Sequence, residues 1–210
     1  TLLASSAASD VYKRQIMLPE QFCVRMKEML GEEYAAFYAS YDLPKYQALR
    51  INPLKTERDT FLLQAPFSLN RVPWTTNGYY YSGNDQPGRH PYHEAGVYYI
   101  QEPSAMAPAE YLMAEPGERI LDLCAAPGGK STQIACSMQG EGLIVCNEIH
   151  PARAKILSEN IERMGVCNAL VTNETPQKLS DNFREYFDRI LVDAPCSGEG
   201  MFRKLSLIHI

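Results

Sequence analysis

A regular alternation of strand-like and helix-like segments in the C-terminal half of the chain restricts the fold most strongly. Strands that alternate with helices pair in parallel, because each helix carries the chain back over one face of the sheet. The pattern therefore predicts an α/β fold with a parallel sheet and helices on its faces. Strands are predicted at 119–124, 143–148, 169–173 and 189–193, and helices at 129–138 and 151–164.

The first hundred residues follow a different pattern. Apolar side chains at helical spacing predict a helix from Leu18 to about Gly31. A short strand is predicted at 48–53, and the Pro-, Gly-, Asn- and Tyr-rich segment 66–96 predicts turns and short strands. A further helix is predicted from Pro103 to about Ala114. A domain boundary near residue 100 follows from this change.

Both ends of the chain are expected to be foreign to the fold. Thr1–Gln15 lacks the continuous apolar core of a signal peptide, and Leu205–Ile210 follows Lys204 abruptly. Both segments resemble translated adapter sequence, although native disordered termini remain the alternative. The predicted domains are therefore 16–100 and 101–204. Four strands are expected where a doubly wound sheet has about six, so the second domain is expected to be C-terminally incomplete.

Composition excludes several classes of protein. The chain has 20 Lys and Arg against 25 Asp and Glu, a formal charge of -5, which argues against a general nucleic-acid coat but not against a local basic patch. Its six cysteines form no CxxC pair, so neither a disulfide framework nor a metal site is predicted. No apolar run approaches the ~20 residues that span a membrane. We predict a cytoplasmic monomer, with four cysteines buried as small apolar side chains: Cys23, Cys136, Cys146 and Cys167.

A glycine turn between the first parallel strand and its helix predicts a nucleotide-like ligand. Asp122 closes the strand, and Gly128-Gly129 begin the helix, whose first amides carry partial positive charge. Glu148 ends the next strand 20 residues after Gly128, a spacing typical of acids that bind ribose hydroxyls. The alternative is a turn that only packs the helix on the strand.

Two other nucleotide motifs fail at this turn. A nicotinamide site requires G-x-G-x-x-G, which the turn lacks. Gly129-Lys130-Ser131 fits the end of a P-loop, but Cys124 stands where the first P-loop glycine belongs, which argues against a nucleotide hydrolase.

A second motif, Asp193-Ala194-Pro195-Cys196, follows the last predicted strand. Open parallel sheets bind ligands at this carboxyl edge. Cys196 lies among Pro, Ser and Gly rather than in an apolar run, so its thiolate is a candidate for adding to an electrophilic carbon or assisting loss of an adduct. Asp193 is a candidate for holding a protonated ring nitrogen.

With these motifs the chain resembles the Sun/Nop family of RNA (cytosine-5) methyltransferases, and within it the RsmF-type enzymes that modify small-subunit ribosomal RNA. The resemblance extends over about residues 16–204. It implies a Rossmann-like S-adenosylmethionine-dependent methyltransferase sheet with a small α+β N-terminal domain. The matching segments are 49–55, 99–106, 122–132, Asn147-Glu148 and 193–204.

The resemblance also implies roles for individual residues. It places the methionine part and ribose of S-adenosylmethionine on the turn, the ribose hydroxyls on Glu148, and the adenine near Glu174, or near Asn173 if the register differs by one. Asp193 lies where cofactor and cytosine meet. The implied turn residues are Cys124, Ala125, Ala126, Pro127, Gly128, Gly129 and Lys130, and the implied catalytic residues are Cys196, Asp193 and Lys130.

The implied chemistry is covalent. A thiolate adds to carbon 6 of cytosine, carbon 5 takes the methyl group, and loss of the carbon-5 proton expels the enzyme. Cys196 matches the cysteine that promotes product release, whereas the attacking cysteine belongs to a Thr-Cys motif that this sequence does not contain. We therefore expect the 210 residues alone to be inactive. The alternative is a non-catalytic module that binds S-adenosylmethionine or RNA.

The implied partner is RNA, either ribosomal RNA or the small ribosomal subunit. Arg50 and Lys55 are candidates for phosphate contacts, with solvated surface as the alternative. Tyr79-Tyr80-Tyr81 would suit base stacking, but an ordinary β-hairpin is the favoured interpretation. His90 and His93 have no Cys or acidic partners at zinc spacing.

Overall fold

The computed structural model describes residues 18–195, which belong to two compact units, with the boundary in the sequence between Lys45 and Tyr46. The first unit contains α1 (Glu20–Leu30) and α2 (Tyr34–Ala39), each followed by a single 3-10 turn (Gly31–Glu33 and Ser40–Asp42). The helix predicted from Leu18 is therefore confirmed. It ends where Gly31 adopts a left-handed φ of 54°.

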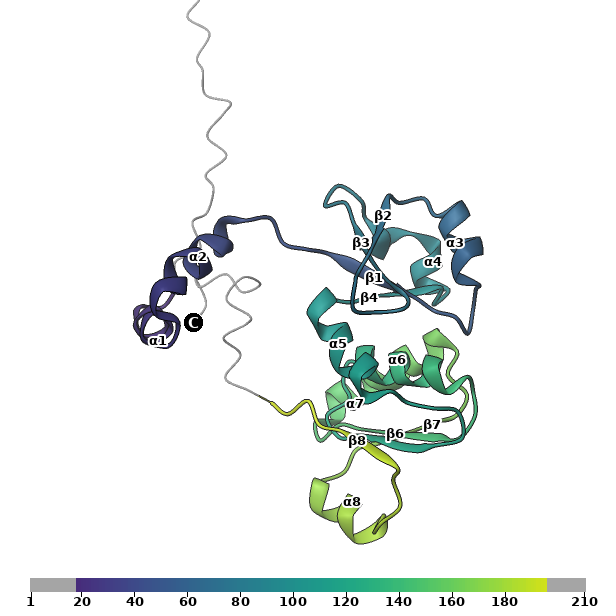
Figure 1. Ribbon diagram of the computed structural model, residues 1–210. Helices are drawn as coiled ribbons and strands as arrows, with labels where there is room; N and C mark the ends of the chain where they lie inside the picture. The colour runs from purple at the N-terminus through teal and green to yellow at the C-terminus, as the bar shows by residue number, and fades with distance from the viewer. Residues whose placement is uncertain (1–17, 196–210) are drawn as a thin grey trace, which may run out of the picture. The chain divides into compact units, whose positions relative to one another are not determined.

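The second unit, Tyr46–Pro195, contains two sheets. The first is antiparallel, in the order β2-β3-β1-β4 (Figure 1). Its inner face is apolar and aromatic, with Leu49 and Ile51 fully buried against Phe61 and Tyr98. Its elements are β1 (Ala48–Ile51), β2 (Leu69–Arg71), β3 (Gly78–Tyr81) and β4 (Tyr98–Ile100), with α3 (Arg58–Gln64), a 3-10 turn at Pro87–Arg89 and α4 (Pro91–Glu94).

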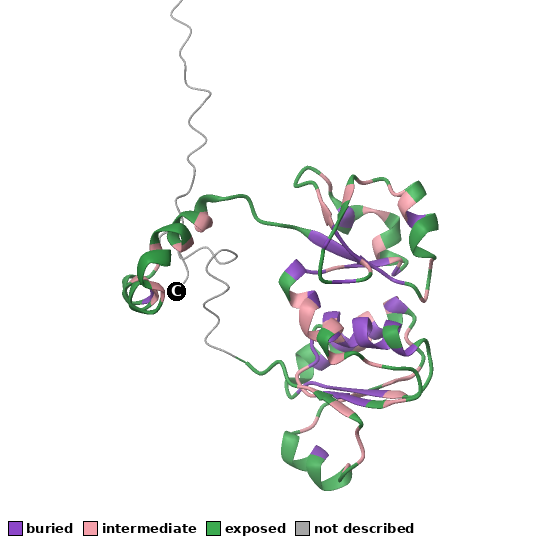
Figure 2. Ribbon diagram, in the orientation of Figure 1, coloured by how far each residue is buried: buried purple, intermediate pink, exposed green. Residues whose placement is uncertain are grey.

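The second sheet is parallel, in the order β7-β6-β5-β8. Buried residues concentrate in its central strands and in α6, which lies between the two sheets with α5 (Figures 1 and 2). Leu179 of α8 packs on the opposite face against Leu121 and Val145. The elements are α5 (Pro103–Leu112), β5 (Arg119–Asp122), α6 (Gly129–Met138), β6 (Leu143–Asn147), α7 (Pro151–Met164), β7 (Ala169–Thr172), α8 (Pro176–Asn182) and β8 (Arg189–Leu191).

The predicted α/β class and its parallel four-stranded sheet are confirmed. The sequence did not predict α8, because Leu179 is the only buried side chain in this seven-residue helix and leaves no apolar period. The predicted boundary near residue 100 falls between the two sheets, which the structure holds in one unit. The tails 1–15 and 205–210 lie outside the described residues.

The two sheets are joined by an unusually close backbone contact. Gly96 has a φ of 69°, and a Cβ built there would lie 2.0 Å from the carbonyl oxygen of Arg163 at the end of α7. Asn52 secures the same contact, because its side-chain amide donates to the carbonyls of both Gly96 and Met164 at 2.8 Å. Only glycine fits such a position.

Candidate functional site

The carboxyl edge of the parallel sheet gathers most of the predicted site residues. Asp122 ends β5, Asn147 ends β6 and is followed by Glu148, and Asp193 follows β8. The strands pair in register, with Asp122 opposite Cys146 and Leu191. This edge is where open parallel sheets bind their ligands.

Asp122 is the most deeply buried acid at this edge, with 1% of its surface exposed. Ser131 Oγ donates to its Oδ2 at 2.7 Å, whereas Oδ1 has no hydrogen-bond partner within residues 18–195. Burial raises the pKa of this carboxyl to about 6, against the opposing effects of the Ser131 hydrogen bond and the nearby Lys130 charge. Asp122 therefore retains an acceptor that the described residues leave unused.

Glu148 is also buried, and its side chain is held from two sides. The backbone amide of His150 donates to Oε1 at 3.0 Å, and Arg153 lies 3.2 Å from Oε2. Arg153 also donates to the carbonyl of Ala126 at 2.8 Å. One arginine thus ties the acid after β6 to the turn after β5.

Asn147 orders the loops around this edge, a role that sequence analysis did not assign. Its amide nitrogen donates to the carbonyls of Leu123 and Glu174, and its oxygen accepts from Thr172 Oγ1 and the Glu174 amide. All four contacts are between 2.9 and 3.2 Å. The only signal in the sequence was an amide side chain at the end of a buried strand.

Lys130 and Asp193, both predicted to be catalytic, form an ion pair of 2.6 Å. It connects the first turn of α6 to the segment after β8. The Lys130 side chain is 20% exposed and that of Asp193 is 56% exposed, so the pair opens to solvent on the acid's side.

Cys124 lies in a negative electrostatic field. Burial raises the pKa of its thiol, and the charges of Asp122, Glu148 and Asp193 raise it further. The thiol is therefore kept protonated rather than activated as a nucleophile. The same field favours a cation bound beside it.

The glycine turn is closely packed on its inner side. Gly128 has a left-handed φ of 109°, and a Cβ there would lie 3.2 Å from Leu157. A Cβ on Gly129 would lie 3.3 Å from the ring of Tyr99 in β4. Ala125 and Ala126 are buried, whereas Pro127 is exposed. Packing thus explains both glycines, and cofactor contact at the turn remains a prediction.

The acid after β7 is more exposed than the acids at the ends of β5 and β6. Glu174 is 42% exposed in its side chain and pairs with Lys178 at 2.9 Å, and Asn173 donates to the Glu148 carbonyl at 2.6 Å. The backbone of Glu174 is fixed by Asn147. Both candidates for the adenine position thus lie beside the acid edge. Cys196 lies outside the described residues.

Two interpretations from the sequence are wrong. Arg50 is only 1% exposed and points into the protein, so it does not meet phosphate. Cys167 is exposed, because it lies in the turn between α7 and β7 rather than in an element. Cys136 and Cys146 are buried as expected, and Cys23 is partly buried. The Tyr79–Tyr81 run lies in β3, in agreement with the hairpin interpretation.

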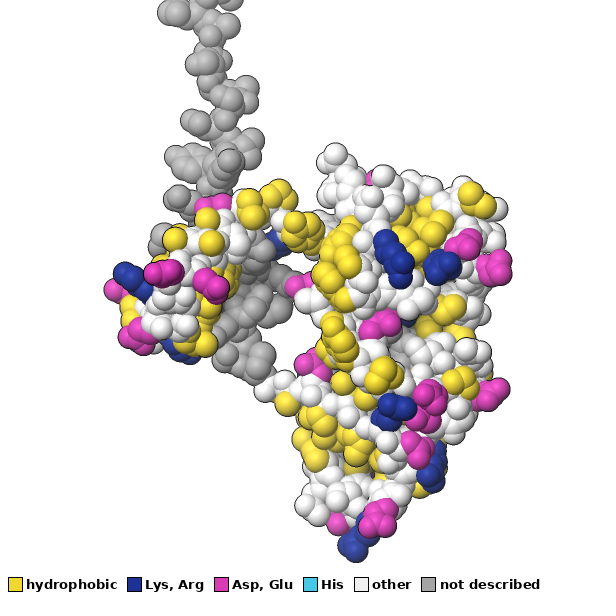
Figure 3. Space-filling view, in the orientation of Figure 1, with side chains coloured by type: hydrophobic (Ala, Val, Ile, Leu, Met, Phe, Trp, Pro, Cys, Tyr) yellow, Lys and Arg dark blue, Asp and Glu magenta, His cyan; other side chains and the backbone are white. Residues whose placement is uncertain are grey.

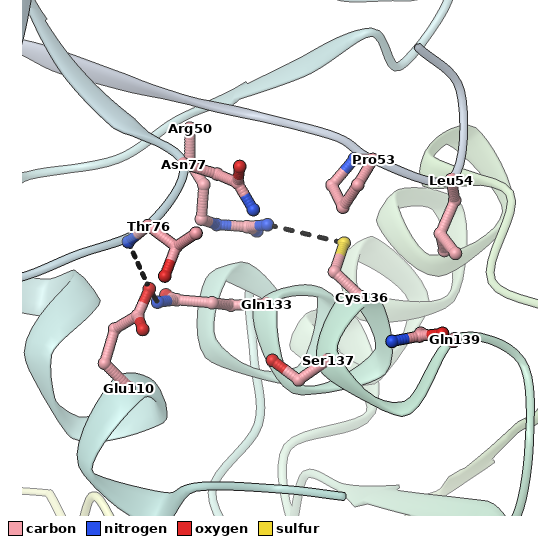
Figure 4. A pocket seen from close by; sticks show the side chains of 10 residues that line it. All are labelled: Arg50, Pro53, Leu54, Thr76, Asn77, Glu110, Gln133, Cys136, Ser137 and Gln139. Atoms are coloured by element: carbon pink, nitrogen blue, oxygen red, sulfur yellow. Dashed lines mark hydrogen bonds between the residues drawn. The ribbon is translucent and has the colours of Figure 1, made fainter. Parts of the chain in front are cut away.

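A polar cavity of about 560 Å³ lies away from the acid edge (Figure 4). It is bounded by β1, the β2–β3 turn, α5 and the C-terminal half of α6. Gln133 Oε1, beside it, has no partner among the described residues. The lining residues are Arg50, Pro53, Leu54, Thr76, Asn77, Glu110, Gln133, Cys136, Ser137 and Gln139.

The face of the Tyr46–Pro195 unit in Figure 3 has no continuous basic patch of the kind that binds nucleic acid. On the face shown in Figure 3, Lys and Arg side chains of the Tyr46–Pro195 unit are scattered among acids and do not merge into one patch. Among the helices of residues 18–195, none combines the length and apolarity needed to cross a membrane.

Two family models match almost the whole chain. Residues 18–103 match the N-terminal domain of 16S rRNA methyltransferase RsmF, and residues 109–210 match 16S rRNA methyltransferase RsmB/F. The chain belongs to this methyltransferase family. Its α/β fold with a parallel sheet is the one that the Sun/Nop resemblance implied.

Curated relatives and solved structures agree with this assignment. The chain is 38% identical to ribosomal RNA small subunit methyltransferase F of Enterobacter sp. strain 638, in an alignment that covers 91% of the chain. It is also 38% identical to the same enzyme of Escherichia coli O157:H7, over 90% of the chain. It spans 42% of the length of each of these relatives.

Among solved structures, a methyltransferase homologue from Pyrococcus horikoshii is 30% identical, with a TM-score of 0.78 over 89% of this chain and 62% of that one. NSun6 from the same organism shares the fold at 20% identity, with a TM-score of 0.75 over 85% of this chain and 71% of that one.

Proposed function

We propose that the chain binds S-adenosylmethionine at the carboxyl edge of its parallel sheet and forms part of an enzyme that methylates carbon 5 of cytosine in small-subunit ribosomal RNA. The observation that carries this proposal is the convergence of Asp122, Glu148 and Asp193 beside the glycine turn in a chain of this family.

The residues at the edge fit a cationic nucleoside. Glu148 has the position and spacing of an acid that accepts ribose hydroxyls. Asp122 Oδ1 is a buried acceptor with no partner in the described part of the chain. The field that raises the Cys124 pKa would stabilise the positive sulfonium of S-adenosylmethionine, and Glu174 would lie near the adenine.

When bound, S-adenosylmethionine supplies an electrophilic methyl group. The chain's own residues prepare the acceptor. Lys130 fixes the Asp193 carboxylate at 2.6 Å, where the carboxylate can hold a proton on a cytosine ring nitrogen while a thiolate adds to carbon 6. After carbon 5 has taken the methyl group, loss of its proton expels the attacking cysteine from carbon 6. We assign the promotion of this release to Cys196, from its place in the sequence after Asp193.

Isothermal titration with S-adenosylmethionine tests the binding step. We expect saturable binding by the chain and at least about tenfold weaker binding by Glu148→Gln, which loses the charged acceptor while keeping its shape. Glu159→Gln is the matched control, because Glu159 is an exposed acid on α7. Absence of binding by the unaltered chain would overturn the proposal.

A methylation assay tests the chemistry separately. The 210 residues contain no Thr-Cys pair, so we expect them to bind the cofactor without transferring its methyl group to a 16S ribosomal RNA fragment. Transfer by these residues would show that the attacking cysteine is one of the six present.

A further inference from the structure

Arg50 extends from β1 of the antiparallel sheet to α6, the helix that begins at the glycine turn (Figure 4). Its side chain is buried, with 1% of its surface exposed, and uses all three nitrogens. Nε donates to Gln101 Oε1 at 3.1 Å, and Nη1 lies 3.7 Å from the Cys136 sulfur. Nη2 donates to the carbonyl of Gly129 at 3.1 Å and to Thr132 Oγ1 at 2.8 Å.

No acid forms an ion pair with Arg50 among the described residues, so neutral acceptors make all of its hydrogen bonds. The Tyr99 ring, whose centroid lies 5.9 Å from the guanidinium carbon, and the more distant charge of Glu110 also favour the cation. Burial still lowers the pKa of Arg50. A buried cation without a counter-ion costs free energy, and an apolar side chain of similar length would fill the same space without that cost. The arrangement therefore calls for a role that needs these particular hydrogen bonds.

The hydrogen bonds converge on the glycine turn. Thr132 Oγ1 accepts from Arg50 and donates to the Gly128 carbonyl at 2.8 Å, so the guanidinium reaches Gly128 through Thr132 and Gly129 directly. In a helix the carbonyls point toward the C-terminus and the amides toward the N-terminus. Each carbonyl shares a planar peptide unit with the amide of the next residue. Fixing the carbonyls of Gly128 and Gly129 therefore also fixes the amides that follow them, which are those available to a ligand at this turn.

We infer that Arg50, acting through Thr132, is a positioning residue that holds the glycine turn in the shape that binds the cofactor. The inference rests on the proposed binding of S-adenosylmethionine. It gives the antiparallel sheet a part in cofactor affinity, although none of its residues lies at the carboxyl edge.

Two substitutions at one buried position separate this role from simple packing. Thr132→Val keeps the shape of the side chain but removes the hydroxyl, whereas Thr132→Ser keeps the hydroxyl and loses a methyl group. If the hydroxyl matters for positioning, Thr132→Val binds S-adenosylmethionine about tenfold more weakly and Thr132→Ser stays within about twofold of the unaltered chain. If only packing matters, Thr132→Val binds normally and Thr132→Ser is the less stable variant.

The control is Thr75→Val, another buried threonine, whose hydroxyl donates to Glu110 Oε1 at 2.6 Å on the other side of the cavity. It should lower the thermal midpoint without changing affinity. Arg50→Lys provides a second test if Thr132→Val does not fold, because the adjoining cavity gives water access to the shortened side chain. We expect it also to bind about tenfold more weakly, because an ammonium group does not reproduce the planar fork.

The outcomes distinguish the two proposals. Normal affinity in both Thr132→Val and Arg50→Lys would overturn the positioning role and leave cofactor binding intact. Failure of the unaltered chain to bind S-adenosylmethionine in isothermal titration would overturn the proposed function and this inference with it.

Discussion

The antiparallel sheet and the carboxyl edge of the parallel sheet both bury polar side chains, but they use them differently. In the antiparallel sheet, Asn52 satisfies both halves of its amide: two carbonyls accept from it, and the Leu54 amide and Cys136 thiol donate to it. At the carboxyl edge, Asp122 is as deeply buried but leaves one oxygen without a partner in residues 18–195.

The difference shows what buried polarity indicates. A buried group whose hydrogen bonds are all made within the protein stabilises the fold, because its partners would be left unsatisfied without it. A buried group with an unused acceptor costs stability, and such groups concentrate at functional sites. Asn147 tests this distinction, since it lies at the carboxyl edge but has all its polar atoms paired.

The largest effect is expected from replacing the two satisfied asparagines. Asn52→Ala and Asn147→Ala should each lower the free energy of unfolding, by up to about 3 kcal/mol, because each leaves two carbonyls without a donor. The two carbonyls are buried at Asn52 and partly buried at Asn147. Urea denaturation measures this loss. Asn84→Ala, at an exposed turn, should change it by less than about 0.5 kcal/mol. A small effect at Asn147 alone would mean that location, rather than hydrogen-bond satisfaction, separates the two regions.

Asp122→Asn should raise the free energy of unfolding near neutral pH, whereas the asparagine substitutions lower it. The pKa of Asp122 is about 6 in the folded protein against 3.8 for the unperturbed group, so the folded state holds this proton more tightly. Its contribution to stability is complete below about pH 4 and is lost as the pH rises through about 6, a change of up to about 3 kcal/mol.

The comparison of Asp122→Asn with the unaltered chain isolates this group from other acids that titrate in the same range. The thermal midpoint of the variant, relative to the unaltered chain, should rise between about pH 4 and pH 7. A difference that stays constant over this range would contradict the raised pKa.

The smallest effect is expected at the ion pair of the carboxyl edge. Lys130→Met removes the contact with a half-exposed Asp193 and should lower stability by about 1 kcal/mol or less, and by less still in about 1 M salt. Lys178→Met, which breaks the surface pair with Glu174, is the control. A loss of several kcal/mol in the free energy of unfolding would mean that Lys130, like Asn52, stabilises the fold.

Regular apolar patterns made most of the parallel sheet predictable. The β5–α6 segment and the acid at Glu148 follow from a buried run, a glycine turn and a fixed spacing, all of which are local in sequence. Arg50 was misjudged because an isolated arginine in a short strand usually lies at the surface, and its acceptors at Gly129 and Thr132 are about eighty residues away. The unused oxygen of Asp122 likewise depends on contacts that only the fold defines.

Gly96 also limits how the sequence can vary. Because any side chain there would collide with the Arg163 carbonyl while φ is positive, we expect a saturation screen for soluble protein to recover glycine alone at this position. Exposed neighbours such as Glu94 should accept many residues. A family member that carried another residue at this position would need a different arrangement of its two sheets.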